Sequence, residues 1–511
     1  MTPQATMIYL KKLLSKQRII TFFSSIIFGF LAHTFIFVNY LPNWDGINNL
    51  YDSQNTIHLG RCFLTLACGI SSYFDLPWIN GLLSLLYIGI SSVLIAELLQ
   101  IKKTSTRIFL SGLLVAFPVI TATFGYMYTA DGYFLSMLCM TLSIFVTLRY
   151  KTGFLAGALF AAFGFGCYQA YITFAIMLVI TYSIKHLLYD NSSAKECITN
   201  FLHCILCLGI GLIIYSILNR FLLRAEGRFL SDYQGIGNFS LTFELFFNIF
   251  SSVKQCLIDF IYFFTGSLSH MNLYSYLNII MLLILVISYF IVIIRIKLWR
   301  TPSKLLLIII FFLSIPFCCF AIRFISPNVS YHMLMHGGLY FMYVLFLLPY
   351  DQCESKPFKL QIFYMWFCCI LSALILYNFI LIANICYQRQ NISVQKSMNI
   401  MNAMVNRIWC LEDLDTAEEI AVLGKLNNID SSISINLPPD MTGFTSDTIM
   451  THSVHYRNIL SDYYNLDFTV ADDAEIEFLN NNNDILTSMP CWPADGSIKV
   501  IDHILIIKLS E

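Results

Sequence analysis

A polar loop near the N-terminus carries the first residues whose types could do chemistry. It reads YLPNWDGINNLYDSQNTIHLGR, Tyr40 to Arg61, and it places Asp45, Asp52 and Arg61 beside Trp44 and other aromatic side chains. A carboxylate can take a proton from a hydroxyl nucleophile within hydrogen-bond reach, and a guanidinium can bind phosphate through paired hydrogen bonds. Only 12% of the chain is charged, so this concentration of charge is a candidate functional site.

The elements around this loop are apolar enough to cross a membrane. The chain has 511 residues and is 57% hydrophobic, and a bilayer core about 30 Å thick needs about 20 apolar residues per helix. We therefore predict a mainly α fold, a polytopic membrane helix bundle, with the segment 246–264 left open as a further span or an interfacial helix. The eleven predicted spans are 19–40, 78–99, 108–124, 132–148, 152–167, 169–188, 198–219, 276–294, 304–322, 335–350 and 360–384.

Basic residues in alternate loops predict the orientation of these spans. Lys11, Lys12, Lys16 and Arg18 precede the first span, and the loops after every second span are also basic. Because cytoplasmic loops are enriched in Lys and Arg, we expect a cytoplasmic N-terminus. The loop from Tyr40 and the C-terminal tail would then face outward, away from the cytoplasm. The first span is long and lacks a small-residue cleavage site, which predicts an uncleaved anchor.

A change in charge near residue 384 predicts two domains, a membrane domain over 1–384 and an acidic, soluble, outward-facing domain over 385–511. From Ile385 onward the chain has 7 Lys and Arg against 18 Asp and Glu, whereas the preceding part has 23 against 13. The tail begins with a helical pattern over Val394–Leu411 and continues with short runs such as EIAVLG, ISINLP and HILIIKL. These runs predict a small α+β domain, in which pairing of Cys410 with Cys491 is left open.

Further polar residues fall in the predicted outer loops, where charge at the edge of a membrane is by default functional. Aromatic and amide side chains suit sugar rings, since they offer flat apolar faces and directed hydrogen bonds. A carboxylate base, phosphate-binding arginines and sugar-binding aromatics at a lipid interface together describe glycosyl transfer from a lipid-phosphate sugar. The residues are Tyr128, Asp131, Tyr168, Gln169, Arg220, Arg224, Arg228, Asp232, Tyr233, Arg323, His332 and His336.

Each of these residues also has a purely structural interpretation. Asp45 lies in NWDG, a sequence typical of a turn. Asp52 would cap a helix beginning near Ser53, and Asp131 would cap the fourth span. The three arginines at 220, 224 and 228 share a helical face and would anchor to lipid headgroups. His332 and His336 are also four residues apart, but no third ligand lies nearby in the sequence, so we predict no protein-built metal site there.

Three stretches carry a resemblance to a known family: NWDGINNLYDSQNTIHLGR after the first span, FGCYQAYITFAI near the middle, and SMPCWPADGSIKVIDHILIIKLS at the C-terminus. The chain resembles the bacterial serotype-converting O-antigen glucosyltransferases, which are similar in architecture to the GT-C class of integral-membrane glycosyltransferases. With the span layout, the likeness covers nearly the whole chain. It departs from the usual pattern at Cys62, where the family more often has a large aromatic residue.

The resemblance implies a donor, polyprenyl-phosphate glucose, and an acceptor, lipid-linked O-antigen or another surface polysaccharide. It implies Asp45 as catalytic base and Asp131 as a second catalytic acidic residue, acting in one inverting displacement. It adds a phosphate-binding or structural role for Arg61, beside Arg220, Arg224, Arg228 and Arg323 as further candidates for the donor phosphate. Trp44, Asp52, Tyr128, Tyr168, Gln169, His332 and His336 are the candidates for sugar or acceptor binding.

The same resemblance places the protein in the bacterial inner membrane, with the outward loops and the C-terminal domain over 385–511 in the periplasm. It also sets the expected partners. They are membrane lipids and the proteins that make and flip the donor, and nucleic acid is not among them. No resident cofactor is expected, because the sugar arrives already activated on lipid, and a requirement for a divalent metal stays open. The transferred hexose and the acceptor linkage cannot be identified from the sequence.

Two other functions remain possible on the sequence alone. A transporter or flippase for a lipid-linked or anionic solute would also have many spans and outward arginines, although transporters usually place polar residues near the midplane. A non-catalytic partner in polysaccharide assembly would use the acidic tail as a binding module. Loss of activity on substitution of Asp45, with normal expression, would separate an enzyme from both.

Overall fold

The computed structural model describes most of the chain, in two compact units. The described residues are 2–4, 14–190, 192–231, 243–266, 273–324, 326, 329–354, 359–426, 441–472, 476, 486 and 488–510. Unit 1 takes in the described residues of Met1–Asn39, Asp52–Ile385 and Asn436–Thr442, and unit 2 those of Tyr40–Tyr51, Cys386–Ile435 and Gly443–Glu511. The first outer loop is therefore divided between the units at Tyr51.

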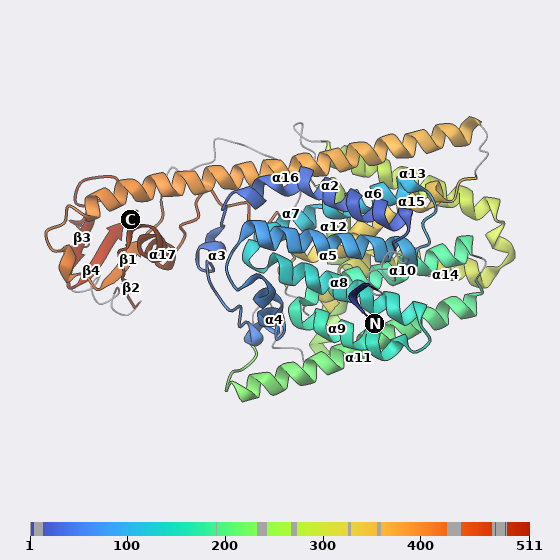
Figure 1. Ribbon diagram of the computed structural model, residues 1–511, viewed down its shortest axis with the longest axis horizontal. Coiled ribbons are helices and arrows are strands. Elements are labelled where there is room, and N and C mark those ends of the chain that lie inside the picture. Colours follow the sequence, from blue (N-terminus) through green and yellow to red (C-terminus); the bar gives the residue numbers. More distant parts are fainter. Residues whose placement is uncertain are drawn as a thin grey trace. The chain divides into compact units, whose positions relative to one another are not determined.

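Unit 1 is a bundle of long apolar helices. Figure 1 shows α2, α5 and α8 side by side, and α8 also packs on α9 and α9 on α11. The main helices are α2 (Lys16–Val38), α5 (Pro77–Leu98), α6 (Thr104–Val115), α7 (Pro118–Phe124), α8 (Met127–Arg149), α9 (Gly153–Cys167), α10 (Ile172–Tyr189), α11 (Ala194–Ala225), α12 (Phe243–Thr265), α13 (Tyr274–Arg295), α14 (Pro302–Cys319) and α15 (Tyr340–Asp351).

The sequence explains how these helices tolerate polar side chains in an apolar bundle. Many buried serine and threonine hydroxyls donate to backbone carbonyls one turn earlier, as Ser84 does to Asn80 and Thr141 to Met137, so these polar groups are satisfied within their own helices. Pro118 divides one predicted span into α6 and α7, because proline cannot donate the hydrogen bond that would continue the helix. Close packing of apolar side chains stabilises the rest of the bundle.

Unit 2 is a small α+β domain. Helix α16 (Lys359–Ile408) runs through the boundary between the units at Ile385, so its last part belongs to unit 2. A four-stranded sheet follows in the order β2-β1-β4-β3, from β1 (Glu419–Leu423), β2 (Thr469–Val470), β3 (Ile498–Ile501) and β4 (Ile504–Lys508). β1 is parallel to β2 and β4, whereas β3 and β4 are antiparallel. Helix α17 (Ser453–Tyr464) packs against β1.

The predicted fold class is confirmed. Ten helices among the described residues are long and apolar enough to span a membrane, and the shorter apolar helix Gly153–Cys167 accounts for the fifth predicted span. Helix α12 over the segment left open is 23 residues long but is not one of those ten. The predicted tail helix beginning at Val394 is wrong in its start, because the sequence from Lys359 has no helix breaker and α16 continues unbroken.

Candidate functional site

A clamped loop in unit 1 presents Arg61. Gly60 adopts φ +76°, a left-handed conformation that glycine adopts without strain. Its carbonyl accepts hydrogen bonds from the Tyr215 hydroxyl of α11 and from Gln169 Nε2, each at 2.7 Å. A Cβ on Gly60 would lie 2.6 Å from the Tyr215 hydroxyl, so no other residue fits. Gln169, predicted to bind sugar, instead helps to fix the turn before Arg61.

Two stacked tyrosines receive the Arg61 side chain. Tyr133 of α8 and Tyr168, between α9 and the short helix η3 (Gln169–Tyr171), stack with ring centroids 4.1 Å apart and planes 11° apart. The guanidinium carbon of Arg61 lies 5.6 Å from both ring centroids, within the range of a cation–π interaction. An arginine thus lies against aromatic side chains at this end of the bundle, as the sequence predicted.

Asp131 lies in α8, two residues before Tyr133, and is only 1% exposed. The helix begins at Met127, so the prediction that Asp131 caps it is wrong: the carboxylate lies one turn inside the helix. Short helix α4 (Leu64–Cys68) packs on α8 over the neighbouring Gly132, where a Cβ would come within 2.7 Å of Leu64. Glycine at this position therefore lets the two helices enclose the carboxylate.

The Asp131 carboxylate is poorly satisfied by the surrounding protein. The Ser71 hydroxyl and the backbone N–H groups of Asp131 and Gly132 lie near it, but the Ser71 hydroxyl is bonded to the Cys68 carbonyl at 3.0 Å. Among the described residues, neither carboxylate oxygen has a partner that meets hydrogen-bond geometry. A buried acceptor without a donor costs about 1–3 kcal/mol, and more when it is charged. This cost marks Asp131 as a residue kept for a ligand or for chemistry.

Two further acceptors, which the sequence analysis missed, lie at the same end of the bundle. Asp75, just before α5, is 5% exposed, and Asn80 in the first turns of α5 is fully buried. Asn80 Nδ2 donates to the Met127 carbonyl at 3.1 Å and so joins α5 to the start of α8. Oδ1 of Asp75 and Oδ1 of Asn80 have no hydrogen-bond partner in the described part of the chain. We call Asp75, Asn80 and Asp131 the acceptor cluster.

The electrostatics of Asp75 show that it interacts with Asp131. Burial, and then the negative charge of Asp131, raise the pKa of Asp75 to about 7. A carboxyl group with such a pKa exchanges its proton near neutral pH, as acid–base chemistry requires. The only sequence signal was an ionisable residue immediately before a span, and FDLP reads equally well as a turn entering a helix.

The segment after α14 carries the predicted residues Arg323, His332 and His336, and His332 interacts electrostatically with Arg61. Burial and the Arg61 cation lower the pKa of His332 to about 4, so it is neutral at physiological pH. His336 is buried, with its ring 5.8 Å from that of Tyr331 in a stacked arrangement. Arg323 is bound to Asp259 of α12 at 2.6 Å and lies 4.7 Å from the Tyr331 ring centroid. Arg323, a candidate for binding the donor phosphate, is therefore paired with a carboxylate in this structure.

The arginines of the long outer loop do not form the predicted single helical face. α11 ends at Ala225 and Gly227 adopts φ +64°, so Arg228 lies beyond the helix that carries Arg220 and Arg224. A glycine in the left-handed conformation is a common helix end. All three arginines are exposed, which fits the headgroup alternative, while Asp232 and Tyr233 lie outside the described residues.

Asp52 is likewise no helix cap. Its carboxylate accepts a hydrogen bond from the Gln54 backbone N–H at 2.5 Å. This is an Asx turn, in which an Asp or Asn side chain bonds the backbone two residues later. Gln54 then adopts φ 55°, so no helix begins near Ser53 and the next helical turn is η1 (Ile57–Leu59). Tyr128 is half-buried in the first turn of α8, with its ring 6.4 Å from that of Tyr126.

Asp45 and Trp44 belong to unit 2. They lie in the short helix α3 (Trp44–Ile47), where Asn43 Oδ1 accepts from the Gly46 N–H at 2.8 Å. The predicted turn chemistry of this stretch is thus carried by Asn43, which leaves the carboxylate of Asp45 half-buried, and burial raises its pKa. The two predicted catalytic carboxylates, Asp45 and Asp131, therefore fall in different units.

The described residues offer no group of three or more His, Cys, Asp or Glu side chains that could hold a metal ion. Cys410 and Cys491, whose pairing was left open, are both free thiols. What unit 1 does offer is a buried set of acceptors and, at the same end of the bundle, a cation held by two aromatic rings. The acceptors can receive hydrogen bonds from several hydroxyl groups, and the cation can bind a negative charge.

Comparison with known proteins adds one match. A family model described as Glucosyl transferase GtrII matches residues 34–350. The match covers more than half of the 511 residues and includes α3, Arg61 and the acceptor cluster. No curated protein and no solved structure matches the chain. The resemblance to glucosyltransferases drawn from the sequence is confirmed.

Proposed function

The chain belongs to the Glucosyl transferase GtrII family and is a membrane glycosyltransferase, and on that basis we propose its substrates and mechanism. It transfers glucose, or another hexose, from a polyprenyl-phosphate sugar to lipid-linked O-antigen or another surface polysaccharide. The reaction takes place on the periplasmic side of the bacterial inner membrane. The N-terminus is cytoplasmic and unit 2 is periplasmic.

One observation carries this proposal: the acceptor cluster and Arg61 lie at the same end of the unit 1 bundle. A hexose brings several hydroxyl donors, which would satisfy the oxygens of Asp75, Asn80 and Asp131 that the protein leaves without donors. A lipid phosphate brings negative charge, which suits the guanidinium of Arg61 over Tyr133 and Tyr168. Sugar and phosphate are the two parts of the proposed donor, and the site has one feature for each.

The proposed reaction is a single displacement. Asp45 takes the proton of an acceptor hydroxyl, whose oxygen forms a bond to the anomeric carbon of the donor sugar. The bond from that carbon to the phosphate oxygen breaks, and the polyprenyl phosphate leaves with the electron pair. Arg61 stabilises the charge that develops on the phosphate, a type of stabilisation that is often the largest single contribution to catalysis. One displacement inverts the anomeric centre.

Unit 2 then has a defined task, which is to hold the loop that carries the base. Ile47 of α3 is 7% exposed in a core formed with residues of α16 and α17. Asn458 Nδ2 of α17 donates to Asn48 Oδ1 at 2.7 Å, and Gln390 of α16 donates to the Pro42 carbonyl. These contacts fix the residues on both sides of Asp45.

Sugar analysis of purified lipopolysaccharide from cells with and without the protein tests the proposal. Wild-type protein should add one hexose, and Asp45→Asn should reduce this addition by about 1,000-fold at equal expression, in the upper part of the range for loss of a general base. Glu354→Gln is the matched control, because Glu354 is an exposed carboxylate paired with Arg295, far along the chain from the proposed site. Near-normal decoration with Asp45→Asn would rule out Asp45 as base.

A further inference from the structure

A second polar site lies at the opposite end of the unit 1 helices from the acceptor cluster. α5 begins two residues after Asp75 and carries Glu97 near its end, and α8 carries Asp131 near its start and Arg149 at its end. At 1.5 Å per residue these pairs are about 30 Å apart along their helices. The end with Glu97 and Arg149 is also the end where the basic loops meet, because Arg295 pairs with Glu354 and Lys102 with Gln352.

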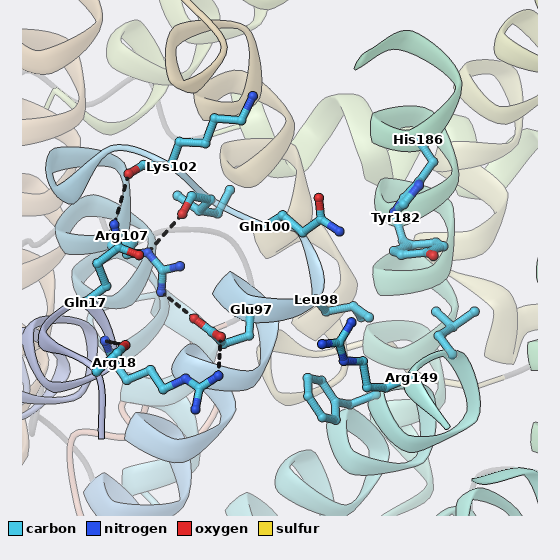
Figure 2. A pocket seen from close by; sticks show the side chains of 14 residues that line it. Gln17, Arg18, Glu97, Leu98, Gln100, Lys102, Arg107, Arg149, Tyr182 and His186 are labelled. Carbon is cyan, nitrogen blue, oxygen red and sulfur yellow. Dashed lines mark hydrogen bonds and ion pairs between the residues drawn. The ribbon is translucent and has the colours of Figure 1, made fainter. Parts of the chain in front are cut away.

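A cavity of about 560 Å³ opens at this end. The side chains around it, shown in Figure 2, come from the segments 15–18, 97–107, 145–149 and 182–186 of unit 1. We call this cavity the basic pocket. Its volume lies in the range of small-molecule sites, about 300–1,000 Å³. The lining residues that matter are Arg18, Glu97, Lys102, Arg107, Arg149 and His186.

The pocket has an excess of positive charge. Four side chains that line it are permanently cationic, and Glu97 is the single carboxylate among the lining residues. That carboxylate is fully used, since Oε2 binds Arg18 at 2.7 Å and Oε1 binds Arg107 at 2.9 Å. Two nearby carboxylates outside the lining also have partners. Asp190 binds Lys185 and His186, and Asp351 accepts hydrogen bonds from the backbone N–H groups of Lys102 and Lys103. Two cations are left without a lining counter-charge.

The pocket is also built rather than formed by loose surface side chains. Arg107 is 4% exposed, and its Nε donates to the Ile101 carbonyl at 3.0 Å, so the guanidinium is fixed before any ligand arrives. Arg149 extends from α8 toward Leu98 and makes no ion pair with any described residue. Across the cavity, Nε2 of His186 is buried without a hydrogen-bond partner among those residues.

Neutral donors and an apolar wall complete the pocket. Gln100 Oε1 accepts from buried Lys185 at 3.2 Å, which leaves the NH₂ group of Gln100 for another acceptor. Leu98, Ile101, Phe145 and Leu148 form the apolar part of the lining. Converging cations with neutral donors suit a phosphate group, and the apolar wall suits the carbon atoms attached to it.

We propose that the basic pocket binds the phosphate of an anionic ligand, a phosphate ester carried on a lipid headgroup or free in solution. This site is separate from the proposed sugar-transfer site and does not depend on that function. Arg149 and Lys102 supply the positive charge that Glu97 does not neutralise. Arg107, held by Glu97 and by the Ile101 carbonyl, directs its remaining N–H groups at the phosphate oxygens.

Native mass spectrometry of the full chain from phosphatidylcholine nanodiscs containing phosphatidylglycerol tests the lipid source. The wild-type protein should retain phosphatidylglycerol in preference to phosphatidylcholine, and Arg149→Gln should retain it roughly tenfold less, as expected for loss of a hydrogen bond to a charged group. Arg149→Lys should restore part of the retention. Arg300→Gln removes an exposed arginine of the same end that does not line the pocket, and it should behave as wild type.

The second arm uses inorganic phosphate with protein in pure phosphatidylcholine nanodiscs. A rise in melting temperature with phosphate that is absent in Arg149→Gln, without selective retention of phosphatidylglycerol, identifies a soluble phosphate ester as the ligand. If Arg149→Gln and Arg300→Gln behave alike with both probes, the pocket is not an anion site and the proposal is wrong. Because Arg149 is exposed, its replacement should leave the melting temperature without ligand unchanged, which checks folding.

Discussion

The two ends of the unit 1 helices treat buried charge in opposite ways. At the end of α5 that carries Glu97, one carboxylate is shared by Arg18 and Arg107 within 2.9 Å. At the other end the charge of Asp131 acts on buried Asp75, and the carboxylate of Asp131 has no partner in hydrogen-bond geometry among the described residues. The same helices thus carry a satisfied ion network at one end and a costly carboxylate pair at the other.

This difference separates groups that stabilise the fold from groups kept for function. Removing the partly buried carboxylate of Glu97 would leave the buried guanidinium of Arg107 without its counter-charge, which costs stability. A buried carboxylate without partners costs stability and persists only where it is used. Substitutions at the two ends should therefore change different measured quantities, activity at one and stability at the other.

The largest expected effect is on transfer activity at the acceptor cluster. Asp131→Asn keeps the shape of the side chain and removes its charge, so we expect glucose on purified lipopolysaccharide to fall about 1,000-fold, in the range for loss of a catalytic acid or base. The melting temperature should stay the same or rise, because a poorly satisfied buried charge is removed. Asp131→Asn protein that decorates lipopolysaccharide normally would contradict a catalytic or binding role for Asp131.

The next effect is on stability at the other end. Glu97→Gln leaves Arg107 buried without its counter-charge, and we expect the free energy of unfolding to fall by about 3 kcal/mol. Glu354→Gln breaks the exposed pair with Arg295 and should cost less than about 1 kcal/mol. Both values can be measured by denaturant titration in the same detergent. Equal costs would show that Glu97 is no more than a surface ion pair.

The third effect is a pH dependence that comes from Asp75. The folded protein holds the proton of Asp75 up to about pH 7, whereas the unfolded chain loses it near the ordinary value of 3.8. Between these values the folded state binds more protons, so stability falls as pH rises and levels off above pH 7. Between pH 5 and 7 this loss amounts to about 2 kcal/mol. Asp75→Asn should remove that slope in thermal melts, and an unchanged slope would show that Asp75 does not titrate there.

The smallest effect is on donor binding. Arg61→Ala should raise the apparent KM for the lipid-phosphate donor about tenfold, since it removes a cation from the Tyr133 and Tyr168 rings and from the proposed phosphate. Arg228→Ala should raise it about twofold, because Arg228 is exposed and lies 3.6 Å from Glu226. Kinetics with purified protein and a synthetic donor measures both. Equal effects would place the phosphate among the exposed loop arginines.

The helices of unit 1 could be predicted because their signal is local. About 20 consecutive apolar residues indicate a span wherever they occur, and each of the eleven predicted segments contains a helix, although Pro118 divides one of them. The end of α11 at Ala225 could also have been predicted, because Gly227 in GR after a run of helix formers is a typical stop signal. The prediction that Arg220, Arg224 and Arg228 share a helical face was wrong for that reason.

The acceptor cluster could not be predicted because its signal is not local. Asp75 reads as a turn residue before Pro77, and its burial depends on α8, which begins some fifty residues later. The stacking of Tyr133 on Tyr168 likewise depends on the packing of α8 against α9. The grouping of Tyr40–Tyr51 with the tail depends on Ile47 entering a core whose other members lie beyond residue 390.

The most direct test of the contrast between the two ends measures two quantities on two variants in one lipid preparation. The transfer rate and the free energy of unfolding are determined for Asp131→Asn and Glu97→Gln, each relative to wild type. We predict a crossed result, in which Asp131→Asn loses activity without losing stability and Glu97→Gln loses stability while the folded fraction keeps its rate. If both variants lose activity in proportion to stability, the acceptor cluster is a structural feature and the account is wrong.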